Sequence, residues 1–130
     1  TWIIGICLGM QLLYDKSYED GEYDGLGLLR GDIVKFDDSE RKVPHMGWNQ
    51  LVKRRDDEIT RGLSDNDYVY FVHSYYLKNE DPDSVICTSY YGVDVPAMIR
   101  KNNIIGMQFH PEKSSAVGVK ILNNIKELIV

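Results

Sequence analysis

A cysteine between two glycines, placed at the end of an apolar run, constrains this chain most. Residues 2–6 form a short continuous apolar stretch, which is typical of a strand buried on both faces of a sheet. Residues 8–14 follow at once and favour a helix, because none of them is β-branched. The predicted order is therefore strand, sharp turn and helix, with Cys7 on the turn between Gly5 and Gly9.

This spacing is that of a nucleophile elbow with cysteine in place of serine. The backbone of an elbow residue is strained and side chains on its neighbours would clash, which explains the two glycines. A helix N-terminus also presents N–H groups and a positive dipole end, so we expect the pKa of Cys7 to fall. The same N–H groups can hold a developing oxyanion. The alternative is a buried cysteine that packs as a small hydrophobic residue.

A second group of polar residues follows the predicted strand at residues 104–109. His110 comes directly after this strand, where a base faces the mouth of the site in α/β sheets. Glu112 can reach the far imidazole nitrogen, hold its tautomer and stabilise the imidazolium. The alternative is a surface histidine beside an exposed glutamate. With Cys7, the two residues form a nucleophile, a base and an orienting group, each after a strand.

Between these two motifs the chain is mostly strand-like. Residues 17–30 are polar and rich in glycine, which predicts a loop or a broken helix end. Residues 101–103 are predicted to form a hairpin turn, because asparagine tolerates positive φ. Runs rich in Val, Ile, Tyr and Phe predict strands at residues 32–36, 48–54, 68–75, 85–90, 97–100 and 104–109.

The C-terminus is predicted to be an amphipathic helix, capped by Ser114 or Ser115. Its apolar residues recur at helical spacing on one face, namely Val117, Ile121, Ile125 and Leu128, joined by Leu122 and Ile129. The order strand, helix, strand-rich stretch and helix indicates an α/β domain with fewer helices than a complete doubly wound fold.

Composition excludes several classes of function. The formal net charge of −5 argues against a nucleic-acid binder, which would need a basic face. The two cysteines, Cys7 and Cys87, have neither the spacing of a zinc site nor that of a disulfide framework, and we predict no metal and no cofactor. Free thiols favour the reducing cytoplasm, and no apolar stretch is long enough to span a bilayer.

Four motifs together resemble a known family. Gly-Ile-Cys-Leu-Gly-Met-Gln at residues 5–11 and Phe-His-Pro-Glu at residues 109–112 look like the class I (triad) glutamine amidotransferases. Val-Pro-His-Met-Gly-Trp-Asn at residues 43–49 and Val-His-Ser-Tyr at residues 72–75 resemble the glutaminase subunit of imidazole glycerol phosphate synthase, from histidine biosynthesis. The resemblance covers essentially all 130 residues and implies a flavodoxin-like open sheet.

The resemblance also implies a reaction. Cys7 attacks the side-chain amide of L-glutamine, and His110, oriented by Glu112, relays the proton, leaving a γ-glutamyl thioester and ammonia. Water then releases glutamate. The resemblance further implies a set of residues that hold the glutamine, namely Gly9, Gln11, Ser74 and Tyr75.

A protein partner is implied as well, a (β/α)₈-barrel synthase subunit bound as a heterodimer. It uses the ammonia to make imidazole glycerol phosphate. One loop is expected at this interface, near the entrance of the ammonia tunnel, and it comprises Pro44, His45, Met46, Gly47, Trp48 and Asn49.

The chain departs from the family at its start. Thr1 leads directly into the apolar run, whereas the family places an oxyanion loop and about two βα units before the elbow. We therefore expect residues 1–130 to be the C-terminal portion of a single domain, strand-rich with two main helices. Losing an oxyanion donor costs on the order of 10²–10³ in rate. The alternatives are a glutaminase of nucleotide, anthranilate or vitamin B6 synthesis, or a non-catalytic interaction module.

Overall fold

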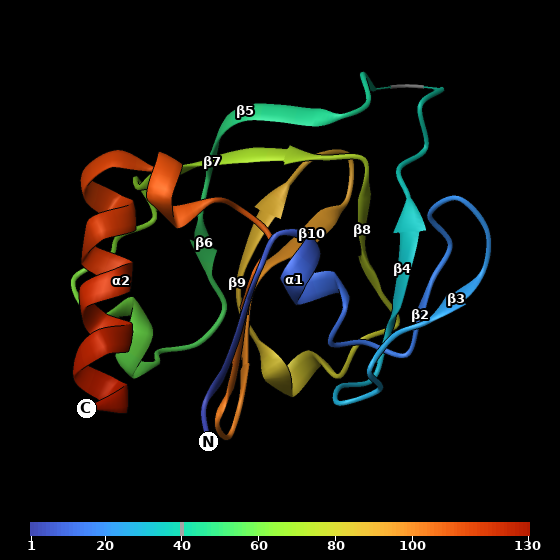
Figure 1. The fold of residues 1–130 in the computed structure, drawn as a ribbon. Helices are drawn as coiled ribbons and strands as arrows, with labels where there is room; N and C mark the ends of the chain where they lie inside the picture. Colours follow the sequence, from blue (N-terminus) through green and yellow to red (C-terminus); the bar gives the residue numbers. More distant parts are fainter. Residues whose placement is uncertain (40) are drawn as a thin grey trace.

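A central five-stranded sheet organises the computed structural model, which describes residues 1–39 and 41–130. Its strand order is β1-β11-β10-β9-β6, and two smaller sheets have the orders β3-β2-β4-β8 and β5-β7. Figure 1 shows α2 on one side of the central sheet, α1 and the β2-β3-β4-β8 sheet on the other, and the β5-β7 pair across one end.

The elements have the following bounds along the chain. The first half comprises β1 (Ile3–Ile6), α1 (Leu8–Gln11), β2 (Lys16–Ser17), β3 (Tyr23–Asp24), β4 (Asp32–Lys35), β5 (His45–Gln50), β6 (Val52–Lys53) and the 3₁₀ turn η1 (Glu58–Thr60). The second half comprises β7 (Tyr68–His73), β8 (Tyr75–Lys78), η2 (Pro82–Ser84), β9 (Val85–Tyr90), β10 (Asp94–Lys101), β11 (Ile104–Met107), η3 (Pro111–Lys113) and α2 (Ser115–Ile129). Among the described helices, none combines the length and the apolar character that crossing a membrane requires.

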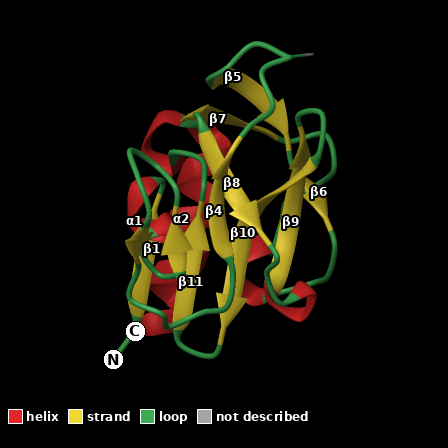
Figure 2. Ribbon diagram, turned by 90° about the vertical axis from the view of Figure 1, so that its right-hand side faces the viewer, coloured by secondary structure: helices red, strands yellow, loops and turns green. Residues whose placement is uncertain are grey.

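Strand β1 pairs in parallel with β11, whereas β11, β10, β9 and β6 pair antiparallel in turn (Figure 2). The predicted hairpin at residues 101–103 is confirmed, because β10 and β11 are antiparallel neighbours and Asn102 has φ 55°. The parallel pair matters for function, since it brings the carboxyl ends of β1 and β11 to the same edge of the sheet.

Two facing glycines let α1 lie close against the sheet. Gly5 and Gly106 are register partners on β1 and β11. A Cβ atom at Gly5 would lie 2.6 Å from the Gly9 carbonyl oxygen, and one at Gly106 would lie 2.9 Å from Cγ of Met10. Both approaches are closer than side chains tolerate, so the turn after β1 depends on these glycines.

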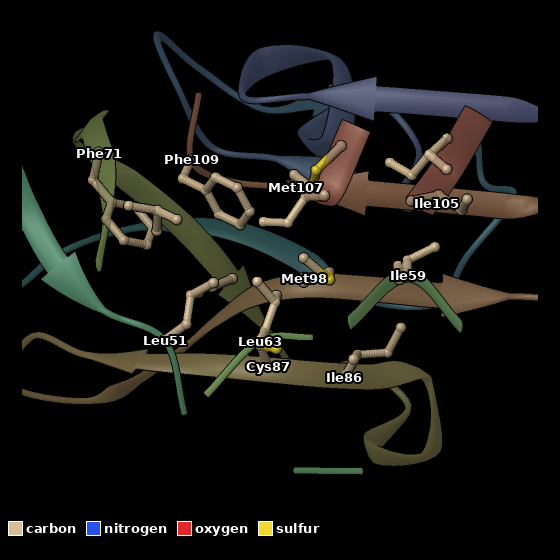
Figure 3. Close-up of a cluster of buried hydrophobic side chains, with 14 residues drawn as sticks. Leu51, Ile59, Leu63, Phe71, Ile86, Cys87, Met98, Ile105, Met107 and Phe109 are labelled. Carbon is tan, nitrogen blue, oxygen red and sulfur yellow. The ribbon is translucent and has the colours of Figure 1, made fainter. Parts of the chain in front are cut away.

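The hydrophobic core has two parts, one on each face of the central sheet. Neighbouring residues of β10 point to opposite faces, so Met98 belongs to the cluster that α2 covers and Ile99 to the cluster that α1 covers. Figure 3 shows the first cluster, in which Met98, Met107 and Phe109 pack together. Burial on both faces fixes the register of the strands that carry the site.

Strand β1 is less buried than predicted. Ile4 is 39% exposed and Ile6 36% exposed, so the expectation of a strand buried on both faces is wrong. Ile3 packs on the α1 side of the sheet, whereas Trp2 packs on the α2 side. Since side chains alternate along a strand, Ile4 and Ile6 share the side of Trp2, where β1 lies at the edge of the described sheet.

Several predicted elements have different bounds in the structure. The strand predicted at residues 48–54 is divided into β5 and β6, and that at residues 68–75 into β7 and β8, because β5 and β7 leave the other sheets and pair with each other. Helix α1 has a single turn where the sequence predicts a helix over residues 8–14, and the predicted loop at residues 17–30 contains the short strand β3.

Helix α2 buries Ile121 and Ile125 as predicted, but Leu122 and Ile129 are about two-fifths exposed and do not join its buried face. Leu122 lies beyond the stripe that faces the sheet, because it is rotated by about 100° from Ile121 around the helix. Ile129 is the last residue of α2 and lies beyond Ile125, the last buried residue of this helix.

Candidate active site

The turn between β1 and α1 has the strained backbone of a nucleophile elbow. Cys7 has φ 54° and ψ −110°, a region that residues with side chains rarely adopt. Its N–H donates to the Met107 carbonyl oxygen (2.7 Å), and its carbonyl oxygen accepts from the Gln11 N–H (3.3 Å). The elbow is therefore tied to both β11 and α1, and the Cys7 sulfur lies 3.8 Å from the Val72 carbonyl oxygen on β7.

The electrostatics of Cys7 correct one prediction. Burial raises the pKa of the Cys7 thiol above its ordinary value, and the charge of Glu112 raises it further. Hydrogen bonds from the Leu8 N–H and the Gln108 side chain act in the opposite direction on this pKa but do not outweigh burial. The expected fall in the pKa fails because desolvation of the half-buried thiol is the largest of these effects. The thiol therefore needs a base to remove its proton.

A hollow of about 190 Å³ opens beside the thiol. It is lined by Cys7, Leu8, Gln11, Glu19 and residues 72–75. A Cβ at Gly9 would meet no other atom within 4 Å, so the expected clash is confirmed at Gly5 but wrong at Gly9. The close approach that requires a glycine is therefore at Gly5, where α1 lies against β1.

The predicted base and its carboxylate are in contact. Nδ1 of His110 lies 2.8 Å from Oε1 of Glu112, which leaves Nε2 of the imidazole to take part in proton transfer. The His110 N–H donates to the Tyr70 carbonyl oxygen (3.0 Å). Ser114 also fixes the turn, since its hydroxyl donates to the His110 carbonyl oxygen (2.6 Å) and accepts from the Tyr70 N–H (3.0 Å).

The predicted helix cap is therefore wrong in detail. Ser114 occupies the N-cap position of α2 but makes no capping hydrogen bond to the helix. Its hydroxyl instead joins the turn at His110 to β7, through the Tyr70 N–H and the His110 carbonyl oxygen.

Gln108 is a site residue that the sequence analysis missed. Its side chain is fully buried, its Oε1 accepts from Nε2 of Gln11 (3.1 Å), and its own Nε2 lies 3.9 Å from the Cys7 sulfur. Nε2 of Gln11 also donates to the Tyr75 carbonyl oxygen (3.1 Å). The available signal was a polar side chain in the apolar run at residues 104–109, since buried amides require partners.

The residues expected to bind glutamine gather around the hollow. Gln11, Ser74 and Tyr75 line it, and Gly9 lies on the adjacent turn. His73, in the same segment, has both ring nitrogens in hydrogen bonds, to His45 (2.9 Å) and to the Tyr75 carbonyl oxygen (2.8 Å).

The residues expected at a protein interface divide into two groups. Met46 and Trp48 are 61% and 52% exposed on the same side of β5, and Pro44, Gly47 and Asn49 are partly buried. His45 is 3% exposed, so its side chain lies in the interior, contrary to the expectation that it contacts a partner. Alternation along β5 explains the difference, because residues 45 and 46 face opposite sides.

Comparison with known proteins agrees with this geometry. Residues 2–127 match the sequence profile of the family described as "Glutamine amidotransferase class-I". The chain belongs to this family. The match confirms the family resemblance that the elbow and the Phe-His-Pro-Glu motif indicated.

Two relatives carry the name "Imidazole glycerol phosphate synthase subunit HisH". The one from Geobacillus sp. (strain WCH70) is 49% identical over 99% of this chain, and that from Geobacillus kaustophilus is 53% identical over 95%. The chain spans 63% and 61% of the lengths of these two relatives.

The fold is shared with more distant proteins. A crystal structure from Thermoplasma acidophilum, described as that of a GMP synthase component, superimposes with a TM-score of 0.70 at 22% identity. The match covers 98% of this chain and 56% of that one. The predicted α/β class I amidotransferase architecture is therefore confirmed.

Proposed function

We propose that this protein hydrolyses L-glutamine to glutamate and ammonia through a thioester on Cys7. The observation that carries the proposal is the strained elbow cysteine directly after β1. Strand β1 pairs with β11, and the turn that follows β11 holds the His110–Glu112 pair. Strain at a non-glycine residue persists only where the surrounding structure over-determines it, as it does at nucleophiles.

In the first half of the reaction, Nε2 of His110 takes the thiol proton and the Cys7 sulfur attacks the side-chain amide carbon of glutamine. The Leu8 and Gly9 N–H groups open the α1 turn and are positioned to donate to the oxyanion that forms. The carbon–nitrogen bond then breaks, the nitrogen takes the proton from His110, and ammonia leaves. Glu112 holds the ring so that the same nitrogen serves both transfers.

In the second half, water attacks the thioester carbon while Nε2 of His110 takes a proton from the water. The carbon–sulfur bond breaks, the sulfur regains a proton, and glutamate leaves. The raised pKa of Cys7 fits this sequence, because a thiol that is protonated at rest depends on its base in each cycle.

The hollow beside Cys7 is proposed to hold the glutamine. Both hydrogens of the Gln11 amide are used, by the Tyr75 carbonyl oxygen and by Gln108. We therefore assign the Gln11 Oε1 atom as the acceptor for the substrate, with the backbone of Ser74 and Tyr75 as the opposite wall.

The ammonia is proposed to pass to a synthase partner that makes imidazole glycerol phosphate in histidine biosynthesis. Support comes from the relatives at 49% and 53% identity, which are named as subunits of that synthase. Met46 and Trp48 supply an exposed apolar surface for a (β/α)₈-barrel partner in a heterodimer. The two free cysteines support action in the reducing cytoplasm.

The first test is mass spectrometry after exposure to an electrophilic glutamine analogue, with and without the barrel partner. Cys87 is a matched control, because it is fully buried and burial raises its pKa to about 12. We expect labelling of Cys7 and none of Cys87, with label lost in Cys7→Ala. Equal labelling of both cysteines, or of neither, would exclude an organised glutamine site.

Steady-state turnover separates the alternatives. Glutamine hydrolysis that the imidazole glycerol phosphate partner stimulates supports the proposed pathway. Stimulation by the synthase partner of a nucleotide, anthranilate or vitamin B6 pathway would assign the protein to that pathway instead. Binding of the partner without hydrolysis of glutamine would indicate a non-catalytic interaction module.

A further inference from the structure

Two buried histidines form a continuous hydrogen-bonded chain between β5 and the substrate hollow. Nδ1 of His45 lies 2.9 Å from Nε2 of His73, and Nδ1 of His73 lies 2.8 Å from the Tyr75 carbonyl oxygen. At the other end, Nε2 of His45 lies 3.1 Å from the side-chain nitrogen of Asn49. Both rings are buried, His45 at 3% exposure and His73 at 7%.

The end at Tyr75 determines where the protons are. A carbonyl oxygen can only accept, so Nδ1 of His73 carries a proton and its Nε2 accepts. Nδ1 of His45 must then donate to His73, and Nε2 of His45 must accept from Asn49. Every donor has one acceptor along this path when both rings are neutral with the proton on Nδ1.

The end at Asn49 leads to the same result independently. The Asn49 Oδ1 atom accepts from the Gln50 N–H (2.7 Å), and Nδ2 donates to the Tyr90 carbonyl oxygen (2.8 Å). These two bonds fix the orientation of the amide, so the group that faces His45 is a donor. The chain of bonds therefore runs in one direction, from Asn49 to the Tyr75 carbonyl oxygen.

Aromatic side chains hold the rings in place. The His45 ring is stacked between those of Phe71 (centroids 4.5 Å apart) and Tyr91 (4.1 Å apart). Phe36 contacts the His73 ring at a centroid distance of 5.2 Å. Such an enclosure disfavours charge: burial lowers the pKa of His45 to about 3 and that of His73 to about 4.

The Tyr75 carbonyl oxygen joins this chain to the site. It accepts from His73 on one side and from Gln11 on the other, so both of its lone pairs are used. Gln11 continues to Gln108, whose Nε2 lies 3.9 Å from the Cys7 sulfur. The position of the hollow wall at residues 72–75 is thus set by contacts that begin on β5.

We propose that His45 and His73 are positioning residues: a one-way relay of hydrogen bonds through two neutral rings holds the Tyr75 carbonyl oxygen and, through it, Gln11 in place to receive glutamine. The relay is a structural property of the free protein. Its effect on glutamine rests on the proposed function.

The proton positions are tested by ¹⁵N nuclear magnetic resonance of the imidazole rings at pH 7. We expect His45 and His73 to show a protonated Nδ1 and an unprotonated Nε2, which is the minor tautomer of a neutral histidine in water. A protonated Nε2 on either ring would overturn the relay. This measurement needs no turnover, so it stands whether or not the protein is a glutaminase.

Steady-state kinetics tests the effect on substrate. His45→Phe keeps a ring between Phe71 and Tyr91 but removes both nitrogens. We expect KM for glutamine to rise about tenfold, as for the loss of one buried hydrogen bond. The value of kcat should change little. His73→Asn keeps a donor near the position of Nδ1 and should restore most of the affinity that His73→Leu loses.

Two results distinguish positioning from a general structural role. Val119→Ala, an exposed site on α2, should leave KM unchanged. An equal fall in kcat and kcat/KM for His45→Phe, or the same KM for His73→Asn and His73→Leu, would overturn the proposal. If the wild-type protein shows no glutamine turnover, the proposed function fails. The ¹⁵N signals of the two imidazole rings then still test whether the relay of hydrogen bonds exists.

Discussion

The three histidines of this chain occupy two opposite environments. His110 lies at the end of the central sheet with 22% of its side chain exposed, and a carboxylate of Glu112 contacts its Nδ1 atom. His45 and His73 lie in the interior among aromatic rings, and their partners are each other, an amide and a carbonyl oxygen. The residue type is the same, but the burial and the hydrogen-bond partners of the rings differ.

This difference shows how one side chain can serve two purposes in a single site. A carboxylate partner and access to water stabilise an imidazolium, which a base that moves protons must become. Burial in a one-way relay requires neutral rings, since a second proton on either ring would leave two donors facing each other. The contrast predicts that substitutions at His110 change turnover, whereas those at His45 and His73 change stability and substrate affinity.

The largest expected effect is at the base. His110→Asn should lower glutamine turnover about 10³-fold, because it removes proton transfer. Stability should change by less than about 1 kcal/mol, since the contact between His110 and Glu112 is partly exposed to solvent. Measurements of turnover and of urea unfolding on the same variant check this. A large loss of stability with unchanged turnover would contradict the distinction between His110 and the two buried histidines.

The next effect concerns the relay. His73→Leu should lower the free energy of unfolding by roughly 1–3 kcal/mol, because it leaves the Nδ1–H group of His45 buried without an acceptor. Urea unfolding measures it, with Val119→Ala as the matched control, expected within about 0.5 kcal/mol of wild type. A loss below that value would mean that the relay contributes nothing to stability.

The pH dependence of stability should follow from the same pair. Their folded-state pKa values, about 3 for His45 and about 4 for His73, lie below the ordinary 6.5. The unfolded chain therefore binds more protons below pH 6.5, so stability is complete above that pH and falls as pH decreases towards 4. Between pH 7 and pH 5 the loss should be about 2 kcal/mol per histidine.

Urea unfolding at the two pH values checks this, with His45→Phe as the comparison. The variant should lose less stability than the wild type over the same interval, because one of the two groups no longer titrates. An equal loss in both proteins would assign the pH dependence to other groups, such as the surface carboxylates.

The smallest effect is expected at the orienting carboxylate. Glu112→Gln should lower turnover about 10- to 100-fold, because a neutral amide still contacts the ring but no longer stabilises its charge. Stability should again change by less than about 1 kcal/mol, given that Glu112 is 49% exposed. A loss as large as that of His110→Asn would mean that the two residues act as one unit.

Much of this site was predictable from the sequence because its signals are local. Gly5 and Gly9 around Cys7 predicted a sharp turn, and Cys7 has positive φ in the structure. His110 and Glu112 are two residues apart, so their contact follows from short-range geometry. Strand β9 and the turn at Asn102 were also identified, since β-forming and turn-forming residues act over a few positions.

Only the tertiary structure decided the rest, because those features depend on partners far away in the chain. The burial of His45 comes from β7, Gln108 joins Gln11 across 97 positions, and β5 separates from β6 by pairing with β7. The direction of the Cys7 pKa shift also depends on residues that are far away in the chain. The sequence places the thiol at a helix N-terminus, but the desolvation that outweighs the helix is known only once the segment at residues 72–75 packs against it.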